Sequence, residues 1–186
     1  MAESKSGCDG PEVTIETGID QIRVSVSDPV ASGIVPKFNQ PGGNITGFAI
    51  LEPTLAGKWL ELLSEIAPGL KRAAIMFNPE IAPLSVYMPS FETAARSLKV
   101  EPIITSVRSD VEIETAMIAL GREPGGGLVV MPSGGFTTVH RAPIISAAAR
   151  NNVPAVYGFS YFARDGGLLS YGVLPYPRRF CCARTR

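Results

Sequence analysis

The 186-residue sequence lacks the motifs that would assign it a chemistry directly. It has no G-x-S-x-G elbow, no phosphate-binding loop of the type G-x-G-x-x-G or G-x-x-x-x-G-K-[ST], and no His/Asp/Glu cluster at metal-ligand spacing. Its single histidine, His140, stands beside Arg141 in a predicted helix, which favours a surface position over a role as general base. The sequence therefore predicts no catalytic residue, no metal and no cofactor.

Charge of one sign and long apolar runs are also missing. Lys plus Arg equals Asp plus Glu at 17 each, which argues against the basic surface of a nucleic-acid-binding protein. No apolar run approaches the roughly 20 residues that a membrane-spanning helix needs. The first ten residues, MAESKSGCDG, lack the apolar segment of a secretory signal peptide. We expect the chain as given to be cytoplasmic, unless an export signal precedes Met1.

Cysteine is scarce and lies close to the two ends of the chain, at Cys8, Cys181 and Cys182. No C-x-x-C spacing and no nearby histidine supports a zinc or redox site. Unpaired surface thiols are the prediction, with a long-range disulfide from Cys8 as the alternative. What the sequence does contain is a composition of 45% hydrophobic and 18% charged residues, which is typical of a globular protein with a substantial core.

Helices and strands alternate through most of the chain. The patterns predict helices over 55–67, 87–98 and 111–120, with Thr54 and Asp110 as N-caps. A further helix is predicted to run to about residue 150, with 137–141 as an irregular first turn and a regular part from about residue 142, because of Pro143. They predict strands over 21–27, 44–51, 72–77, 100–107, 128–131, 153–157 and 167–171, and a short helix over 30–38. Pro102 indicates that pairing of its strand starts late or that the strand lies at an edge. This order predicts a parallel, doubly wound α/β sheet of the flavodoxin or Rossmann type, covered on both faces.

Ligands of such sheets bind beyond the carboxyl ends of the strands. The loops expected there offer hydroxyls, amides, aromatic rings and helix N-termini, which suit a small polar or zwitterionic ligand. In this reading amide N–H groups receive a carboxylate and Asp28 receives an ammonium group. The candidate ligand-binding residues are Asp28, Asn78, Tyr87, Ser133, Thr137, Phe159 and Tyr161. Each has a structural alternative, as a turn former, a helix cap or a core residue.

Four segments carry a resemblance to a known family. They are SVSDPVASGIV…FNQPGGNITGF, LAGKWLELLSEIAPGLKRAAIMFNP, GGLVVMPSGGFTTVHR and VPAVYGFSYFARDGGLLSYG. Together they resemble the substrate-binding components of ABC transporters, in the group related to tryptophan- and tyrosine-binding proteins. The likeness covers about residues 22–173.

The resemblance implies a type I periplasmic-binding-protein fold, in which two α/β lobes joined by a hinge close on a small ligand. It implies a periplasmic or extracellular location and an ABC permease as partner. On this basis we expect a poorly structured segment 1–20, a remnant of lobe 1 with the hinge crossover at 21–54, lobe 2 at 55–173 and an atypical tail at 174–186. The chain is thus expected to be truncated relative to the family.

Three functions remain open at this point. The first is a solute-binding component of an importer, without catalysis, for an amino acid or an aromatic or organic acid. The second is a ligand-sensing regulatory module of the same fold, and the third is a cytosolic enzyme on a flavodoxin-like sheet, since fold alone does not fix function. A single lobe leaves sheet edges and apolar surface uncovered, so the sequence also predicts a homodimer.

Overall fold

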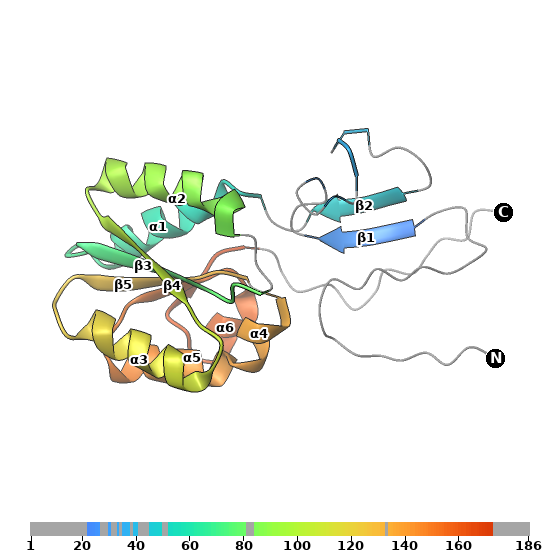
Figure 1. Cartoon of the computed structure of the whole chain (residues 1–186). Coiled ribbons are helices and arrows are strands. Elements are labelled where there is room, and N and C mark those ends of the chain that lie inside the picture. Colours follow the sequence, from blue (N-terminus) through green and yellow to red (C-terminus); the bar gives the residue numbers. More distant parts are fainter. Residues whose placement is uncertain are drawn as a thin grey trace, which may run out of the picture.

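The computed structural model describes residues 22–26, 30, 33, 35–37, 39–40, 45–49, 52–80, 84–132 and 134–172. They form a five-stranded sheet layered between helices, and a separate pair of strands, β1 (Ile22–Val26) and β2 (Ile45–Ala49) (Figure 1). The pair is parallel, with Ile22 opposite Ile45. Two of the predicted ligand-binding residues, Asp28 and Ser133, lie outside the described residues.

All five strands of the larger sheet run parallel. They are β3 (Arg72–Phe77), β4 (Glu101–Ser106), β5 (Gly126–Val130), β6 (Ala155–Tyr157) and β7 (Leu169–Ser170), in the spatial order β4-β3-β5-β6-β7. Counted within this sheet the order is 2-1-3-4-5, which is the flavodoxin-like arrangement. The predicted fold class is therefore confirmed. The strand order reverses between β3 and β5, so the switch point where ligands bind in such sheets lies between their carboxyl ends.

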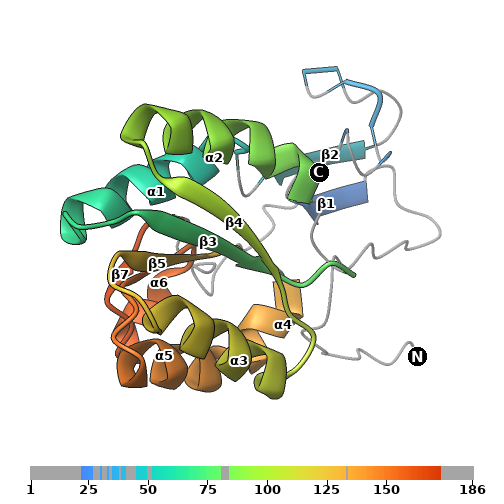
Figure 2. The same ribbon diagram turned by 60° about the vertical axis from the view of Figure 1, so that its left-hand side comes forward.

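Helices cover both faces of this sheet (Figures 1 and 2). α1 (Leu55–Ile66) and α2 (Leu84–Leu98) lie on one face, which we call the first face. The other face, the second face, carries α3 (Asp110–Gly121), α4 (Gly134–Val139), α5 (Arg141–Arg150) and α6 (Ser160–Arg164).

Alternate residues of the central strands pack in two separate hydrophobic cores, one on each face of the sheet. Ile75 of β3 and Val129 of β5 pack under α1 and α2 with Trp59 and Phe91, all fully buried. Their chain neighbours point the other way, into a core under α3, α5 and α6 that includes Met76, Val130, Ile113, Met117, Ile144 and Phe162. Strands buried on both faces need to be apolar, which explains the apolar sequence of β5 and that of β3 after Arg72.

Of the two interpretations of Pro102, the edge position is confirmed, because β4 is the outermost strand next to β3 and its pairing already includes Pro102. Proline has no N–H to donate to a ladder and is tolerated where one side of the strand has no neighbour. The side chain of Ile104 in β4 is 57% exposed, in contrast to the fully buried Ile75 opposite it in β3. The loss of cover at this edge accounts for the difference.

Several local predictions were wrong. In the 30–38 region the described residues form no helix: the Gly33 amide bonds to the Val30 carbonyl in a tight turn, and Gly33 has a φ of +69°. The cap of α3 is Ser109, one residue before the predicted Asp110, and its side chain accepts from the Glu112 amide at 3.3 Å. Thr54 does stand at the N-cap of α1, but its side chain makes no capping bond.

The region after β5 also differs from its prediction. Two helices, α4 and α5, replace the single helix that was expected to end near Arg150, and His140 separates them. Pro143 lies in the first turn of α5, where a missing N–H costs nothing because these amides have no helical partner. The short helix α6, between the last two strands, was not predicted at all. No helix among the described residues is long and apolar enough to cross a membrane.

Candidate functional site

The carboxyl ends of the strands meet at one edge of the sheet, where α4 and α6 begin (Figure 1). The segments that leave this edge follow β3 at Asn78, β5 at Met131, β6 at Gly158 and β7 at Tyr171. We call this part of the molecule the carboxyl edge. All five predicted ligand-binding residues that the structure describes lie on elements that leave it.

Asn78 and Tyr87 belong to the connection between β3 and α2. Asn78 is 4% exposed, and its Oδ1 accepts a hydrogen bond from the Glu80 amide at 2.9 Å, which closes a turn directly after β3. Tyr87 is 2% exposed and packs in the first-face core, with its ring 6.5 Å from that of Trp59. The geometry gives Asn78 the role of a turn former at the switch point and Tyr87 that of a buried support beneath it.

Trp59 is a residue at this edge that was not among the candidates predicted from the sequence, although it lies in the predicted helix over 55–67. Its side chain is fully buried, and its indole Nε1–H donates to the carbonyl of Tyr171 at 2.6 Å. This bond connects α1, where the chain enters the sheet, to the residue after β7. Two glycines make the approach tight: a Cβ on Gly158 would meet Pro132 at 2.6 Å, and one on Gly172 would meet the Gly158 carbonyl at 2.2 Å.

Thr137 and Ser160 carry buried hydroxyls that have no partner. Each Oγ atom is inaccessible to solvent and makes no hydrogen bond, and Thr137 as a residue is fully buried. They lie on α4 and α6, which follow the adjacent strands β5 and β6. An unsatisfied buried hydroxyl typically costs about 1–3 kcal/mol. The fold therefore keeps two unpaired polar groups in helices that leave the carboxyl edge.

An aromatic and polar cluster connects α4, α5 and α6. The hydroxyls of Thr138 and Tyr161 lie 2.7 Å apart, the rings of Phe159 and Tyr161 stack at 5.2 Å, and the Arg141 guanidinium lies 5.2 Å above the Tyr161 ring. Arg141 also donates to the Asp165 carboxylate. Burial raises the pKa of Tyr161, while the Thr138 hydroxyl and the Arg141 charge act against that shift. Phe159 and Tyr161, both predicted from sequence, are thus brought together, and Arg141 is an addition.

His140 takes part in a structural contact. Its Nδ1 lies 2.5 Å from Asp110 Oδ1, and its ring packs on Phe136 with centroids 4.3 Å apart. The contact connects the break between α4 and α5 to the first residue of α3. Within the described part of the chain, no three His, Cys, Asp or Glu side chains are grouped as a metal site would require.

The comparison with protein families decides the class of the chain. The sequence model of the family described as ABC transporter substrate binding protein matches residues 14–177. The chain belongs to this family. The predicted resemblance is confirmed by this match.

Individual relatives agree with the assignment. A curated tyrosine-binding protein of Clostridioides difficile (strain R20291) is 25% identical over 162 residues, which are 87% of this chain and 42% of that protein. The chain thus spans less than half the length of this curated relative.

Two solved structures share the fold. One is an ABC domain in complex with L-Trp from Streptococcus pneumonia (TM-score 0.69, 18% identity, covering 86% of this chain and 59% of that one). The other is the ligand-free, open structure of a substrate-binding protein with adhesive properties from Clostridium difficile (TM-score 0.59, 24% identity, covering 80% and 48%).

Proposed function

We propose that the chain acts as a solute-binding component of an ABC importer, or as one lobe of it. The ligand is a small polar organic molecule such as an amino acid or an aromatic or organic acid, held in a cleft at the carboxyl edge and not chemically changed. The match to the family over residues 14–177 is the observation that carries this proposal. The flavodoxin-like strand order supports it, because that order places a ligand crevice at the same edge.

In this proposal the described residues divide the work between them. The Thr137 hydroxyl, buried and unpaired, supplies a hydrogen bond, and the stacked rings of Phe159 and Tyr161 supply an aromatic wall. Asn78 shapes the switch-point loop and Tyr87 supports it from the core. Asp28 and Ser133, outside the described residues, complete the predicted set with a carboxylate for an ammonium group and a second hydroxyl.

The arrangement of domains is part of the proposal. Residues 55–173 form lobe 2, and residues 21–54 belong to lobe 1 and the crossover between lobes. The strand pair β1 and β2, which forms a sheet of its own, supports this division. A permease is the partner on the membrane, and the location is periplasmic or extracellular, as the family assignment favours.

Ligand-dependent stabilisation tests the binding step. A ligand held only by the folded state at 100 times its Kd adds about 2.7 kcal/mol, which for a chain of this size raises Tm by roughly 5–10 °C. We expect such a rise from at least one member of a panel of amino acids, aromatic acids and short organic acids. The ligand should be recovered unchanged after incubation. A panel with no shift on the 186-residue chain and on a version extended at both ends would overturn the proposal.

A matched pair of variants locates the site. Thr137→Val keeps the side-chain volume and removes the unpaired hydroxyl, so we expect weaker binding by roughly tenfold with no loss of stability. Thr115→Val on the exposed side of α3 is the control and should leave affinity unchanged. Equal affinity in all three proteins would place the ligand elsewhere.

Uptake separates import from sensing. Disruption of the gene should lower cellular uptake of the ligand found in the panel. A change in transcription with normal uptake would favour the regulatory module instead.

A further inference from the structure

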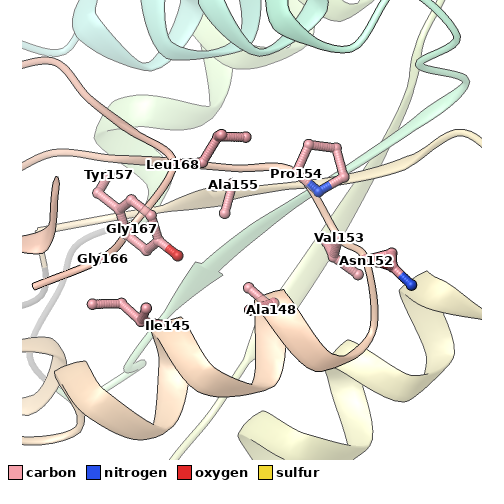
Figure 3. Close-up of a pocket in the computed structure, with 11 residues that line it drawn as sticks. Ile145, Ala148, Asn152, Val153, Pro154, Ala155, Tyr157, Gly166, Gly167 and Leu168 are labelled. Carbon is pink, nitrogen blue, oxygen red and sulfur yellow. The ribbon is translucent and has the colours of Figure 1, made fainter.

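A second hollow lies away from the carboxyl edge, between the latter half of α5 and the segment that leads into β7 (Figure 3). It opens beside the amino ends of β6 and β7 and has a volume of about 380 Å³. None of the candidate ligand-binding residues described above lines it.

The lining is apolar and carries no charge. Ile145 and Ala148 of α5 form one wall, Ala155 of β6 forms the floor, and Leu168, which is 63% exposed, forms the opposite rim. Of the eleven lining residues only Asn152 and Tyr157 have polar side chains, and neither is ionised at neutral pH. Because a charged ligand would lose its hydration here with nothing to replace it, the hollow selects against ions.

Tyr157 supplies the one buried polar group of the hollow. Its side chain is 1% exposed, and its ring stacks on Phe162 with centroids 4.6 Å apart. Its hydroxyl makes no hydrogen bond to any described residue. Figure 3 shows it pointing between Ile145 and Ala148. Burial raises the pKa of Tyr157 to about 12, so at neutral pH the hydroxyl stays protonated and can donate.

Two glycines, Gly166 and Gly167, leave room for the Tyr157 ring. A Cβ on Gly167 would lie 2.7 Å from the Tyr157 ring, so a larger residue there would displace the tyrosine. Gly166 has a φ of +104°, a conformation that other residues rarely adopt. The two glycines let the chain turn closely over the ring.

We propose that this hollow is a second binding site, separate from the carboxyl edge, for a small uncharged ring compound that accepts a hydrogen bond from Tyr157. Its volume lies within the range of small-molecule sites, about 300–1,000 Å³, and its lining has their usual composition, apolar with a few placed polar groups. A bound acceptor pairs with a hydroxyl that has no hydrogen bond to the described residues, and a flat ring covers the exposed Leu168 rim. The site is independent of the ligand proposed for the carboxyl edge.

Three matched probes test the chemistry: phenol, benzene and benzoate. Each is titrated into the 186-residue chain while the methyl NMR signals of Ile145, Ala148 and Leu168 are followed. We expect phenol to bind roughly fivefold more tightly than benzene, as one hydrogen bond allows, and benzoate to give no saturable shift. Tyr157→Phe should weaken phenol binding to the level of benzene and leave benzene binding unchanged.

Two exposed-site variants provide a second test that does not depend on Tyr157. Leu168→Asp places a charge at the rim and should abolish the phenol shifts, while Val111→Asp, at a 75% exposed position on α3, should not. The proposal is overturned if phenol shifts only methyl groups near α4 and α6, if benzoate binds as well as phenol, or if Tyr157→Phe keeps the full preference for phenol. It is also overturned if none of the probes shifts the three methyl signals.

Discussion

The two faces of the five-stranded sheet differ in what their side chains do. On the first face the large side chains are buried, and the polar contacts at the carboxyl edge run to the backbone: Trp59 donates to the Tyr171 carbonyl, and the Ser90 hydroxyl bridges the Gly57 amide and the Thr54 carbonyl. On the second face side chains contact one another, as in the Thr138–Tyr161 pair. The second face also contains the unpaired Thr137 and Ser160 hydroxyls and the hollow beside Tyr157.

The difference separates support from recognition. Side chains that bond to the backbone fix the path of the chain. Their polar groups already have partners and are not offered to a ligand. Unpaired hydroxyls and partly exposed rings lower stability but offer groups that a ligand can use. We therefore expect substitutions on the first face to affect mainly stability and those on the second face to affect mainly binding.

The largest effect is expected at Trp59. Trp59→Ala removes a fully buried side chain and its bond to Tyr171, and should lower the free energy of unfolding by about 3–5 kcal/mol. Trp59→Phe keeps an aromatic ring but loses the indole N–H, and should cost about 1–2 kcal/mol through the unpaired Tyr171 carbonyl. Urea unfolding followed by far-UV circular dichroism measures both. A Trp59→Phe variant as stable as the unchanged chain would remove the hydrogen bond from this account.

Alkaline pH should reveal the buried tyrosine of the second face. Below pH 10 Tyr157 is neutral in both the folded and the unfolded state, so its full contribution to the free energy of unfolding is present. Between pH 10 and about 12 the unfolded chain ionises first, because the folded pKa is raised to about 12. The free energy of unfolding should therefore fall by up to about 3 kcal/mol over this range.

Tyr157→Phe is the control for the alkaline loss. We expect its stability to decline less between pH 10 and 12 than that of the unchanged chain, with the raised pKa of Tyr161 still contributing in the same direction. Urea midpoints at unit steps of pH measure the difference. Parallel curves for the two proteins would contradict the prediction.

A smaller effect on stability is expected at Gly158, which follows β6 at the carboxyl edge. Gly158→Ala places a methyl group 2.6 Å from Pro132 and 3.3 Å from Trp59, and should cost about 1–3 kcal/mol through overpacking. The matched control is Gly69→Ala, where a Cβ has no neighbour within 4 Å. Thermal unfolding of both variants compares them, and the prediction is wrong if Gly69→Ala is destabilised as much.

The smallest effect is expected at Arg141. Arg141→Gln removes the ion pair with Asp165 and the cation over the Tyr161 ring, both of which are partly exposed. Together these contribute about 1 kcal/mol. Arg164→Gln, at an exposed position in α6, should change stability by less than about half that amount. Salt should reduce the Arg141 effect, and an effect that persists unchanged at 1 M salt would point to packing instead.

The sequence was sufficient to predict the parallel α/β fold, because buried strands and amphipathic helices leave clear periodic patterns. Pro102 indicated an edge strand or a late start of pairing for the same kind of local reason. The five residues of α6 are too few to show a helical period, so this element was missed. At α3 two adjacent residues, Ser109 and Asp110, are both good caps, and only the backbone angles of Ser109 select it.

The candidate site was less accessible to sequence reasoning than the fold. Phe159 and Tyr161 stand two positions apart, and their loop could be chosen from the rule about carboxyl ends. The bond between Trp59 and Tyr171 joins positions 112 residues apart, and no local sequence pattern predicts it. That the Thr137 hydroxyl has no hydrogen-bond partner depends in the same way on the tertiary environment of α4. A helix-capping pattern in the sequence carries no information about that environment.

Trp59 is the only tryptophan in the chain, and it is fully buried against the exit of the last strand. The ultraviolet emission of the protein therefore reports on one joint, the place where α1 meets the residue after β7. A movement that opened this joint would admit water to the indole and shift its emission to longer wavelength. Trp59 is thus an intrinsic fluorescent probe for any hinge motion that starts at the carboxyl edge, and no added label is needed.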